Sequence, residues 1–136
     1  MKTSSNESHS DTDLLKVLFV DDNPAICQCA QQFLERAGYS VMLAGDGFQA
    51  LSKVVQWQPD IVLADIAIPR LDGYQMCALI KSNSDFQHIL VIMLSGKKGQ
   101  FDEERASLVG SDSHVAKPFS AKMLTSMLDS MARQRP

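Results

Sequence analysis

Cysteine, basic charge and long apolar runs are all scarce in this sequence of 136 residues. The three cysteines, Cys27, Cys29 and Cys77, have neither the even number of a disulfide framework nor the paired spacing of a zinc site, so we expect free thiols. Thirteen Lys and Arg residues stand against sixteen Asp and Glu residues, without any basic run. Nucleic-acid binding is therefore not expected, because it depends on a basic surplus that neutralises phosphates.

The longest apolar run, Ile89 to Leu94, is far shorter than the roughly 20 residues that a membrane-spanning helix needs. The amino-terminal segment also lacks the apolar core of a signal peptide. We therefore expect a cytoplasmic protein without membrane insertion. The chain is long enough for one compact domain, which we place at residues 14–136. Residues 1–13 are polar and have almost nothing to bury, so we expect a flexible tail there.

From Leu14 onward, short apolar runs alternate with helical patterns. The runs are continuous, which indicates strands that are buried on both faces of a parallel sheet flanked by helices, an α/β fold. Five strands are predicted, at Val17–Val20, Val41–Ala44, Ile61–Ala64, Ile89–Leu94 and Val115–Ala116. Helices are predicted between Asn23 and Gly38, from about Phe48 to before Pro59, from about Asp72 to Lys81, between Asp102 and Gly110, and from Ser120, the last one burying Met123, Leu124, Met127, Leu128 and Met131.

Polar side chains follow the apolar residues of four predicted strands: Asp21 and Asp22, then Asp65, Ser95 and Lys117. The carboxyl ends of parallel strands meet at one edge of the sheet, where open α/β sheets bind their ligands. Three carboxylates in one place repel one another unless a cation lies among them. Oxygen ligands without His or Cys favour Mg²⁺ or Mn²⁺, and Mg²⁺ often takes a phosphate oxygen as a further ligand. The pattern thus predicts phosphate chemistry, although each residue alone could merely cap a helix or end a strand.

These residues stand in segments that resemble the receiver domain of two-component response regulators. The segments are residues 20–23 (VDDN), 65–73 (DIAIPRLDG), 94–96 (LSG) and 117–119 (KPF), and the resemblance extends over residues 14–133. It implies a CheY-like (βα)5 fold of the flavodoxin type, a doubly wound five-stranded parallel sheet with strand order 2-1-3-4-5. Within the family, residues 69–81 and 109–112 resemble the PilG-type receivers of type IV pilus twitching motility.

The resemblance implies a chemical role for each polar residue at the sheet edge. Asp65 would accept a phosphoryl group from a phosphohistidine of a sensor histidine kinase, or from a small acyl phosphate, to form an aspartyl phosphate. Asp22, Asp65 and the backbone carbonyl of Ala67 would bind Mg²⁺ directly, and Asp21 largely through water. Lys117 would neutralise charge on the phosphoryl oxygens during the transfer. Ser95 would donate a hydrogen bond to the attached phosphoryl group.

His114 stands three positions before the lysine, where receivers often have Tyr or Phe. In the family that ring turns inward when the hydroxyl residue, here Ser95, moves toward the phosphoryl group. We interpret His114 as a polar switch residue whose charge can change near neutral pH, and an ordinary exposed histidine is the alternative. The family also suggests a cis peptide before Pro118. Substitution of Ala67 or Lys97, which flank the phosphorylation site, is expected to alter the dephosphorylation rate.

Only three residues follow Arg133, so we expect output through a protein partner and not through a DNA-binding or enzymatic domain. By resemblance, the phosphorylated chain would bind this partner with its fourth helix, fifth strand and fifth helix, at about residues 102–131. A phosphorelay intermediate that passes its phosphoryl group to another histidine is an alternative. A Mg²⁺-dependent phosphatase is more remote, because the familiar version of that class has an Asp-x-Asp motif where this chain has adjacent Asp21 and Asp22. We thus expect a signalling protein that catalyses only its own phosphorylation and dephosphorylation.

Overall fold

The computed structural model describes residues 14–96 and 101–133, in which strands and helices alternate. The strands are β2 (Lys16–Val20), β3 (Ser40–Ala44), β4 (Ile61–Asp65), β5 (Leu90–Ser95) and β6 (Ser113–Ala116). The helices are α2 (Pro24–Arg36), α3 (Gly47–Trp57), α4 (Gly73–Ser82), α5 (Glu103–Val109) and α6 (Ala121–Arg133). All strand pairs are parallel, in the order β3-β2-β4-β5-β6. The predicted fold class and strand order are confirmed, while the predicted tail lies outside the described residues.

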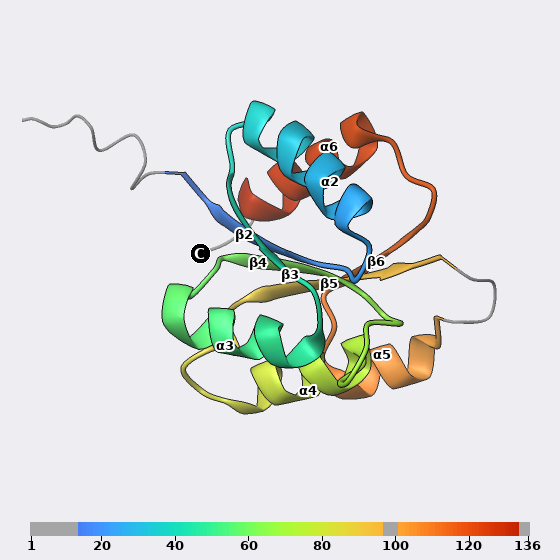
Figure 1. The fold of residues 1–136 in the computed structure, drawn as a ribbon. Helices are drawn as coiled ribbons and strands as arrows, with labels where there is room; N and C mark the ends of the chain where they lie inside the picture. Colours follow the sequence, from blue (N-terminus) through green and yellow to red (C-terminus); the bar gives the residue numbers. More distant parts are fainter. Residues whose placement is uncertain (1–13, 97–100, 134–136) are drawn as a thin grey trace, which may run out of the picture.

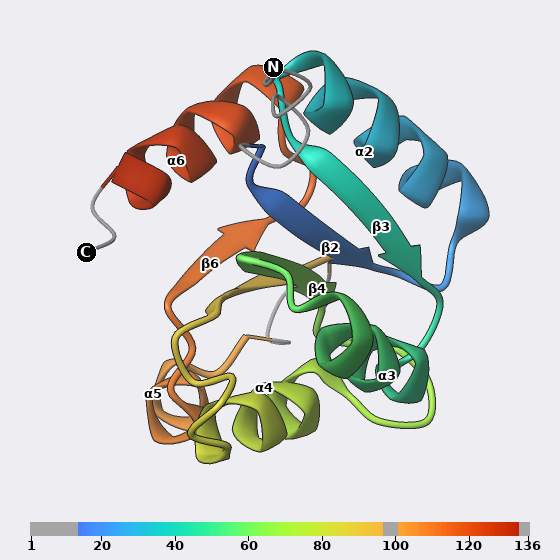
Figure 2. The same ribbon diagram turned by 90° about the vertical axis from the view of Figure 1, so that its left-hand side faces the viewer.

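The sheet lies between two layers of helices. Figure 1 shows α2 and α6 on one face and α3, α4 and α5 on the other, and the rotated view in Figure 2 agrees. Successive residues of a strand point to opposite faces, so Val17 and Phe19 of β2 pack under α2 and α6, whereas Leu18 and Val20 belong to the other core. All four side chains are fully buried. This arrangement explains why the strands are continuous apolar runs.

The helix boundaries follow from capping residues that the sequence shows. Asn23 caps α2 by accepting hydrogen bonds from two backbone N–H groups of the first turn, and Pro24 follows at the first helical position. Ala37 ends that helix as its C-cap, and Gly38 follows with φ of 99°. Asp102 caps α5, which ends at Gly110 with φ of 81°. None of the helices within the described residues is long and apolar enough to cross a membrane.

Helix α6 corrects one prediction. Leu124 and Leu128 are fully buried, and Met127 and Met131 pack against the same core as predicted. Met123, however, is 48% exposed, so the prediction that it is buried was wrong. It precedes Leu124 by one position, which places it about 100° around the helix from that buried residue, toward solvent.

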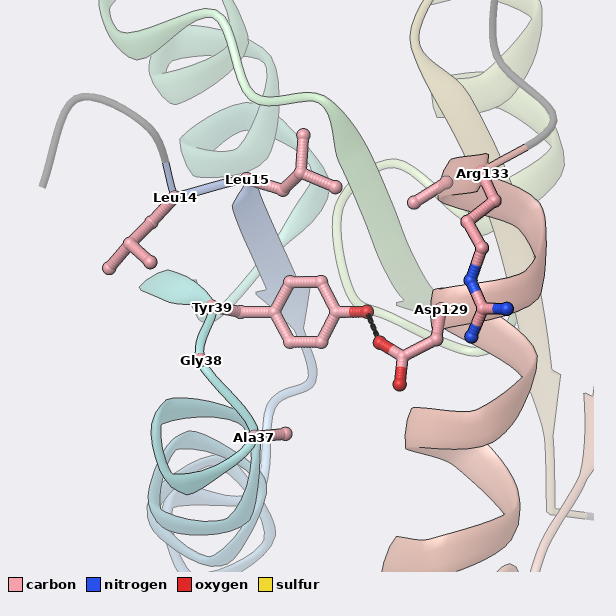
Figure 3. Close-up of a pocket in the computed structure, with 8 residues that line it drawn as sticks. Leu14, Leu15, Ala37, Gly38, Tyr39, Asp129 and Arg133 are labelled. Atoms are coloured by element: carbon pink, nitrogen blue, oxygen red, sulfur yellow. Dashed lines mark hydrogen bonds between the residues drawn. The ribbon is translucent and has the colours of Figure 1, made fainter. Parts of the chain in front are cut away.

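A tyrosine at the amino-terminal side of β3 connects that strand to α6. The Tyr39 hydroxyl donates a hydrogen bond to the Asp129 carboxylate, and the side chains meet beside a shallow pocket of about 300 Å³ (Figure 3). Leu14 and Leu15, which come before β2, also line this pocket. Because the strands are parallel, the pocket lies at the opposite end of the sheet from the carboxyl edge and is separate from the site described next.

Candidate functional site

The register of the strands brings the predicted site residues to one edge. Val20 pairs with Ala64, so the residues that follow them, Asp21 and Asp65, leave the sheet side by side. On the other side of β4, Asp65 pairs with Leu94, which Ser95 follows. These side chains therefore meet because parallel strands end together, although they are far apart in the sequence.

A lysine ammonium joins the two carboxylates. Lys117 Nζ lies 2.8 Å from Asp21 Oδ2 and 2.6 Å from Asp65 Oδ2. The Asp21 side chain is only 2% exposed, and the other two are partly buried. Burial opposes the charged form of Lys117, but the hydrogen bonds with Asp21 and Asp65 and the charges of both carboxylates outweigh it, so the pKa of Lys117 is raised. Lys117 is thus a fixed cation at this site.

Backbone groups fix the second oxygen of each carboxylate. The Ala67 N–H donates to Asp65 Oδ1 at 2.9 Å, and the Asn23 N–H donates to Asp21 Oδ1 at the same distance. Each carboxylate therefore has one oxygen held by the backbone of its own loop and the other directed at Lys117. This geometry presents Asp65 in one orientation at the carboxyl edge of the sheet.

Asp22 does not join the pair. Consecutive residues that leave a strand point to opposite sides, and Asp22 is exposed whereas Asp21 is buried. Among the described residues, no group of three or more Asp, Glu, His or Cys side chains is gathered so as to hold a metal ion. The structure thus brings together two of the three predicted carboxylates. Their donor chemistry nevertheless fits Mg²⁺, because every candidate ligand is an oxygen, and the exposed Asp22 carboxylate lines a pocket together with Asp21.

Two glycines allow α3 and α4 to begin directly against the loop that follows Asp65. A Cβ on Gly73 would lie 2.9 Å from Ile66 Cα, and one on Gly47 would lie 2.3 Å from the Leu71 carbonyl oxygen. Real Cβ atoms essentially never come this close to other heavy atoms, so a larger residue would push the loop away. The loop that carries the Ala67 N–H is therefore held between the ends of two helices.

Ser95 and His114 form a second contact at the same edge. Ser95 Oγ lies 2.7 Å from His114 Nε2, and Phe101 stacks on the imidazole ring with centroids 3.7 Å apart. The ring is partly buried, so His114 is not the ordinary exposed histidine considered as the alternative. Burial lowers the pKa of His114. Sequence reasoning did not identify Phe101, and its aromatic side chain next to the start of α5 was the available signal. Lys97 lies outside the described residues.

The surface around the site has two shallow pockets. One of about 300 Å³ is lined by Asp21, Asp22 and residues of α2 and α3, and the other, of about 390 Å³, is lined by Ile26, Lys117 and Phe119 among others. The Lys117–Pro118 peptide is cis, as the resemblance suggested. Both pockets open to solvent beside the carboxylate pair, so a second molecule can approach the site from the α2 side.

An open, doubly wound sheet with an acidic pair and a lysine at its carboxyl edge defines an α/β protein of the class that binds ligands at that edge. Comparison with known proteins then gives the family. The model of the response regulator receiver domain matches residues 17–129, and the chain belongs to this family. It is thus a CheY-like receiver of two-component signalling, not a conventional enzyme.

Individual relatives agree with this assignment. The chain is 49% identical over 113 residues to Protein PilG of Pseudomonas aeruginosa, which covers 83% of this chain and 84% of that protein. It spans about half the length of several other curated relatives that it matches. The structure of chemotaxis response regulator CheY4 of Vibrio cholerae matches with a TM-score of 0.80 and 28% identity over 86% of this chain and 98% of that one. The receiver domain of sensor histidine kinase PA1611 of P. aeruginosa PAO1, with a magnesium ion coordinated in its active-site cleft, matches with a TM-score of 0.78 and 30% identity over 86% and 96%.

Proposed function

We propose that a histidine kinase phosphorylates this chain on Asp65 in a Mg²⁺-dependent reaction, and that the phosphoryl group switches binding to a protein partner. The observation that carries this proposal is the environment of the Asp65 carboxylate. Lys117 Nζ binds one of its oxygens at 2.6 Å, and the Ala67 N–H binds the other at 2.9 Å. A carboxylate held this way is oriented, partly exposed and next to a cation that can neutralise incoming phosphoryl oxygens.

The reaction requires little from the protein except positioning and charge. An Asp65 oxygen attacks phosphorus, the bond from phosphorus to the donor's imidazole nitrogen breaks, and an acyl phosphate forms. Lys117 would stabilise the developing charge from its place beside Asp65, because one ammonium can contact both the carboxylate and the phosphoryl oxygens. Asp21, Asp22, Asp65 and the carbonyl of Ala67 would hold Mg²⁺, which neutralises phosphoryl oxygens when bound. Ser95 then donates a hydrogen bond to the attached group.

The partner is proposed to bind the face made by α5, β6 and α6, roughly residues 102–131. Leu108 of α5 is 83% exposed and Met123 of α6 is also exposed, although neither is needed by the core. Helices α5 and α6 cover opposite faces of the sheet beside the edge strand β6, and an exposed apolar side chain on each favours a protein over a small ligand. The similarity to PilG supports a cytoplasmic role in type IV pilus twitching motility or in chemotaxis-like signalling.

Phosphorylation is tested by incubation of the chain with Mg²⁺ and acetyl phosphate, followed by intact-mass measurement. Wild type should gain one phosphoryl group, whereas Asp65→Asn should gain none, because the amide is a poor nucleophile. Asp129→Asn, a matched change at the far end of the sheet, serves as the control and should be phosphorylated like wild type. Absence of a mass gain in wild type, or an equal gain in Asp65→Asn, would reject the proposal.

The output is tested by capture of partners from cell extract, with and without beryllofluoride, a mimic of the phosphoryl group. Leu108→Ser should reduce the beryllofluoride-dependent capture. Phe48→Ser, which also replaces an exposed apolar side chain but lies on α3, should not. Transfer of the phosphoryl group to a histidine of a captured protein would instead identify the chain as a phosphorelay intermediate. Equal capture in both states would contradict a phosphorylation-dependent switch.

A further inference from the structure

His114 of β6 faces Ser95 of β5 on the side of the sheet that α5 covers. In the parallel ladder His114 pairs with Met93, and Ser95 follows two residues later on the same face of β5. His114 Nε2 lies 2.7 Å from Ser95 Oγ, while Phe101 stacks on the ring with an interplanar angle of 14°. Stacking and hydrogen bonding together hold the imidazole, so Nε2 has one fixed direction, toward the serine.

One hydrogen atom fits between Nε2 and Oγ, and its position decides what else Ser95 can do. An imidazole nitrogen either carries a proton and donates, or has a lone pair and accepts, whereas a serine hydroxyl has a single proton to donate. If Nε2 has a lone pair, Ser95 gives that single proton to His114. If Nε2 carries a proton, Ser95 accepts through a lone pair, and its own proton is free to turn to another acceptor.

The second acceptor would be the phosphoryl group on Asp65, so the inference rests on the function proposed for that residue. Ser95 follows Leu94, which pairs with Asp65, and the Lys117 N–H donates to the Ser95 carbonyl at 2.8 Å. Phosphoryl oxygens accept hydrogen bonds and repel a lone pair. We infer that His114 is a positioning residue for the phosphoryl group: the form with a proton on Nε2 releases the Ser95 hydroxyl to donate, and the other form withholds it.

The surroundings of His114 make this choice depend on pH. Burial alone lowers the pKa of His114, and no charged group among the described residues contributes. Ser95, Met93 and Phe101 are uncharged, and the titratable neighbour of Phe101, Asp102, is engaged as the cap of α5. At neutral pH the ring is therefore mostly neutral and has two tautomers, only one of which carries the proton on Nε2. Protonation at lower pH gives a cation with both nitrogens protonated, which favours release of the Ser95 hydroxyl.

The test is the binding of beryllofluoride in the presence of Mg²⁺, measured by calorimetry between about pH 5 and 8. The affinity of wild type is divided by that of His114→Phe, which keeps an aromatic ring against Phe101, so that pH effects on all other groups cancel. This ratio should rise roughly tenfold as pH falls through the titration of His114, since one hydrogen bond to a charged group is gained. The affinity of His114→Gln divided by that of His114→Phe should not change with pH, because the glutamine amide does not titrate.

Two further measurements decide the role of Ser95 and of the proton. In the Ser95→Ala background the pH dependence of the ratio should disappear. In ¹⁵N spectra of wild type, the Nε2 resonance should move from the unprotonated to the protonated range when beryllofluoride is added, and this result does not depend on any variant folding. A constant wild-type ratio, or an Nε2 that stays unprotonated in the adduct, overturns the inference. If wild type is also not phosphorylated by acetyl phosphate, it is the proposed function of Asp65 that fails.

Discussion

At the scale of single residues, the site depends on one ammonium group. Lys117 is the only described cation bound to both Asp21 and Asp65, and it occupies oxygens that a metal ion would also use. In Lys117→Met, the competing charge is gone and two carboxylates are left near each other. We expect Mg²⁺ to bind this variant roughly tenfold more tightly than wild type, as measured by calorimetry, even though phosphorylation becomes slower. Lys122→Met, which removes an exposed lysine of α6, is the control, and an unchanged or weaker Mg²⁺ affinity in Lys117→Met would contradict this account.

A second residue-scale prediction concerns the buried Tyr39. Burial, followed by the hydrogen bond with Asp129 and the charge of that carboxylate, raises the pKa of Tyr39 in the folded protein. The unfolded chain therefore loses the phenolic proton first as pH rises, so the stability that the hydroxyl contributes is complete below about pH 10 and declines above it. Urea denaturation should show wild type about 1 kcal/mol more stable than Tyr39→Phe near neutral pH, and this difference should shrink above pH ~10. If the difference in stability does not change with pH, the hydrogen bond from Tyr39 to Asp129 is not the source of the added stability.

At the scale of elements, one lysine links α4 to the neighbouring loops through hydrogen bonds and an ion pair. Lys81 Nζ donates to the carbonyls of Gln87 and Ile89, at 3.1 and 2.6 Å, and pairs with Asp112 Oδ2 at 2.7 Å. The same carboxylate oxygen accepts the Val91 N–H at 2.8 Å. The carboxyl end of α4, the start of β5 and the loop before β6 thus share one network, in which the lysine side chain is 16% exposed.

Removal of this lysine should destabilise the fold because it leaves the partly buried Asp112 and two carbonyls without their cation. We expect Lys81→Met to lower the free energy of unfolding by about 2 kcal/mol, measured by urea denaturation. The exposed Lys122 again provides the matched control, since Lys122→Met should change stability by less than about 0.5 kcal/mol. Equal effects of the two substitutions would mean that the network around α4 contributes little.

At the scale of the whole molecule, the three thiols report on the integrity of the fold. Cys29 is exposed, whereas Cys27 and Cys77 are buried on opposite faces of the sheet. Burial raises the pKa of Cys77 to about 11, and burial together with the charge of Asp21 raises that of Cys27. Since the thiolate is the reactive form, one thiol per molecule should react rapidly with a disulfide reagent at about pH 8, and the other two at the rate of unfolding. Cys29→Ser should remove the fast phase, and two fast thiols in wild type would contradict the predicted packing.

Much of this molecule could be predicted from the sequence because the relevant information is local. Apolar runs of four to six residues identified four strands and a run of two residues the fifth, and residues such as Asn23 and Gly110 marked helix ends through hydrogen bonds or dihedral angles of their own segment. The order of the polar residues at the strand ends could also be predicted from the sequence. A parallel sheet needs no further information to gather Asp21, Asp65 and Lys117 at one edge.

Only the tertiary structure decided where individual side chains point and which distant groups they meet. It placed Asp21 inward on Lys117 and left Asp22 exposed, and it joined Ser95 to His114 beneath Phe101. These outcomes depend on the side toward which a strand end turns and on packing between elements far apart in the chain, which no short pattern specifies. The composition and order of the residues therefore determined the fold and the identity of the edge residues. The contacts that would govern the reactivity of Asp65 and the hydrogen bonding of Ser95 arise only when the strands lie side by side.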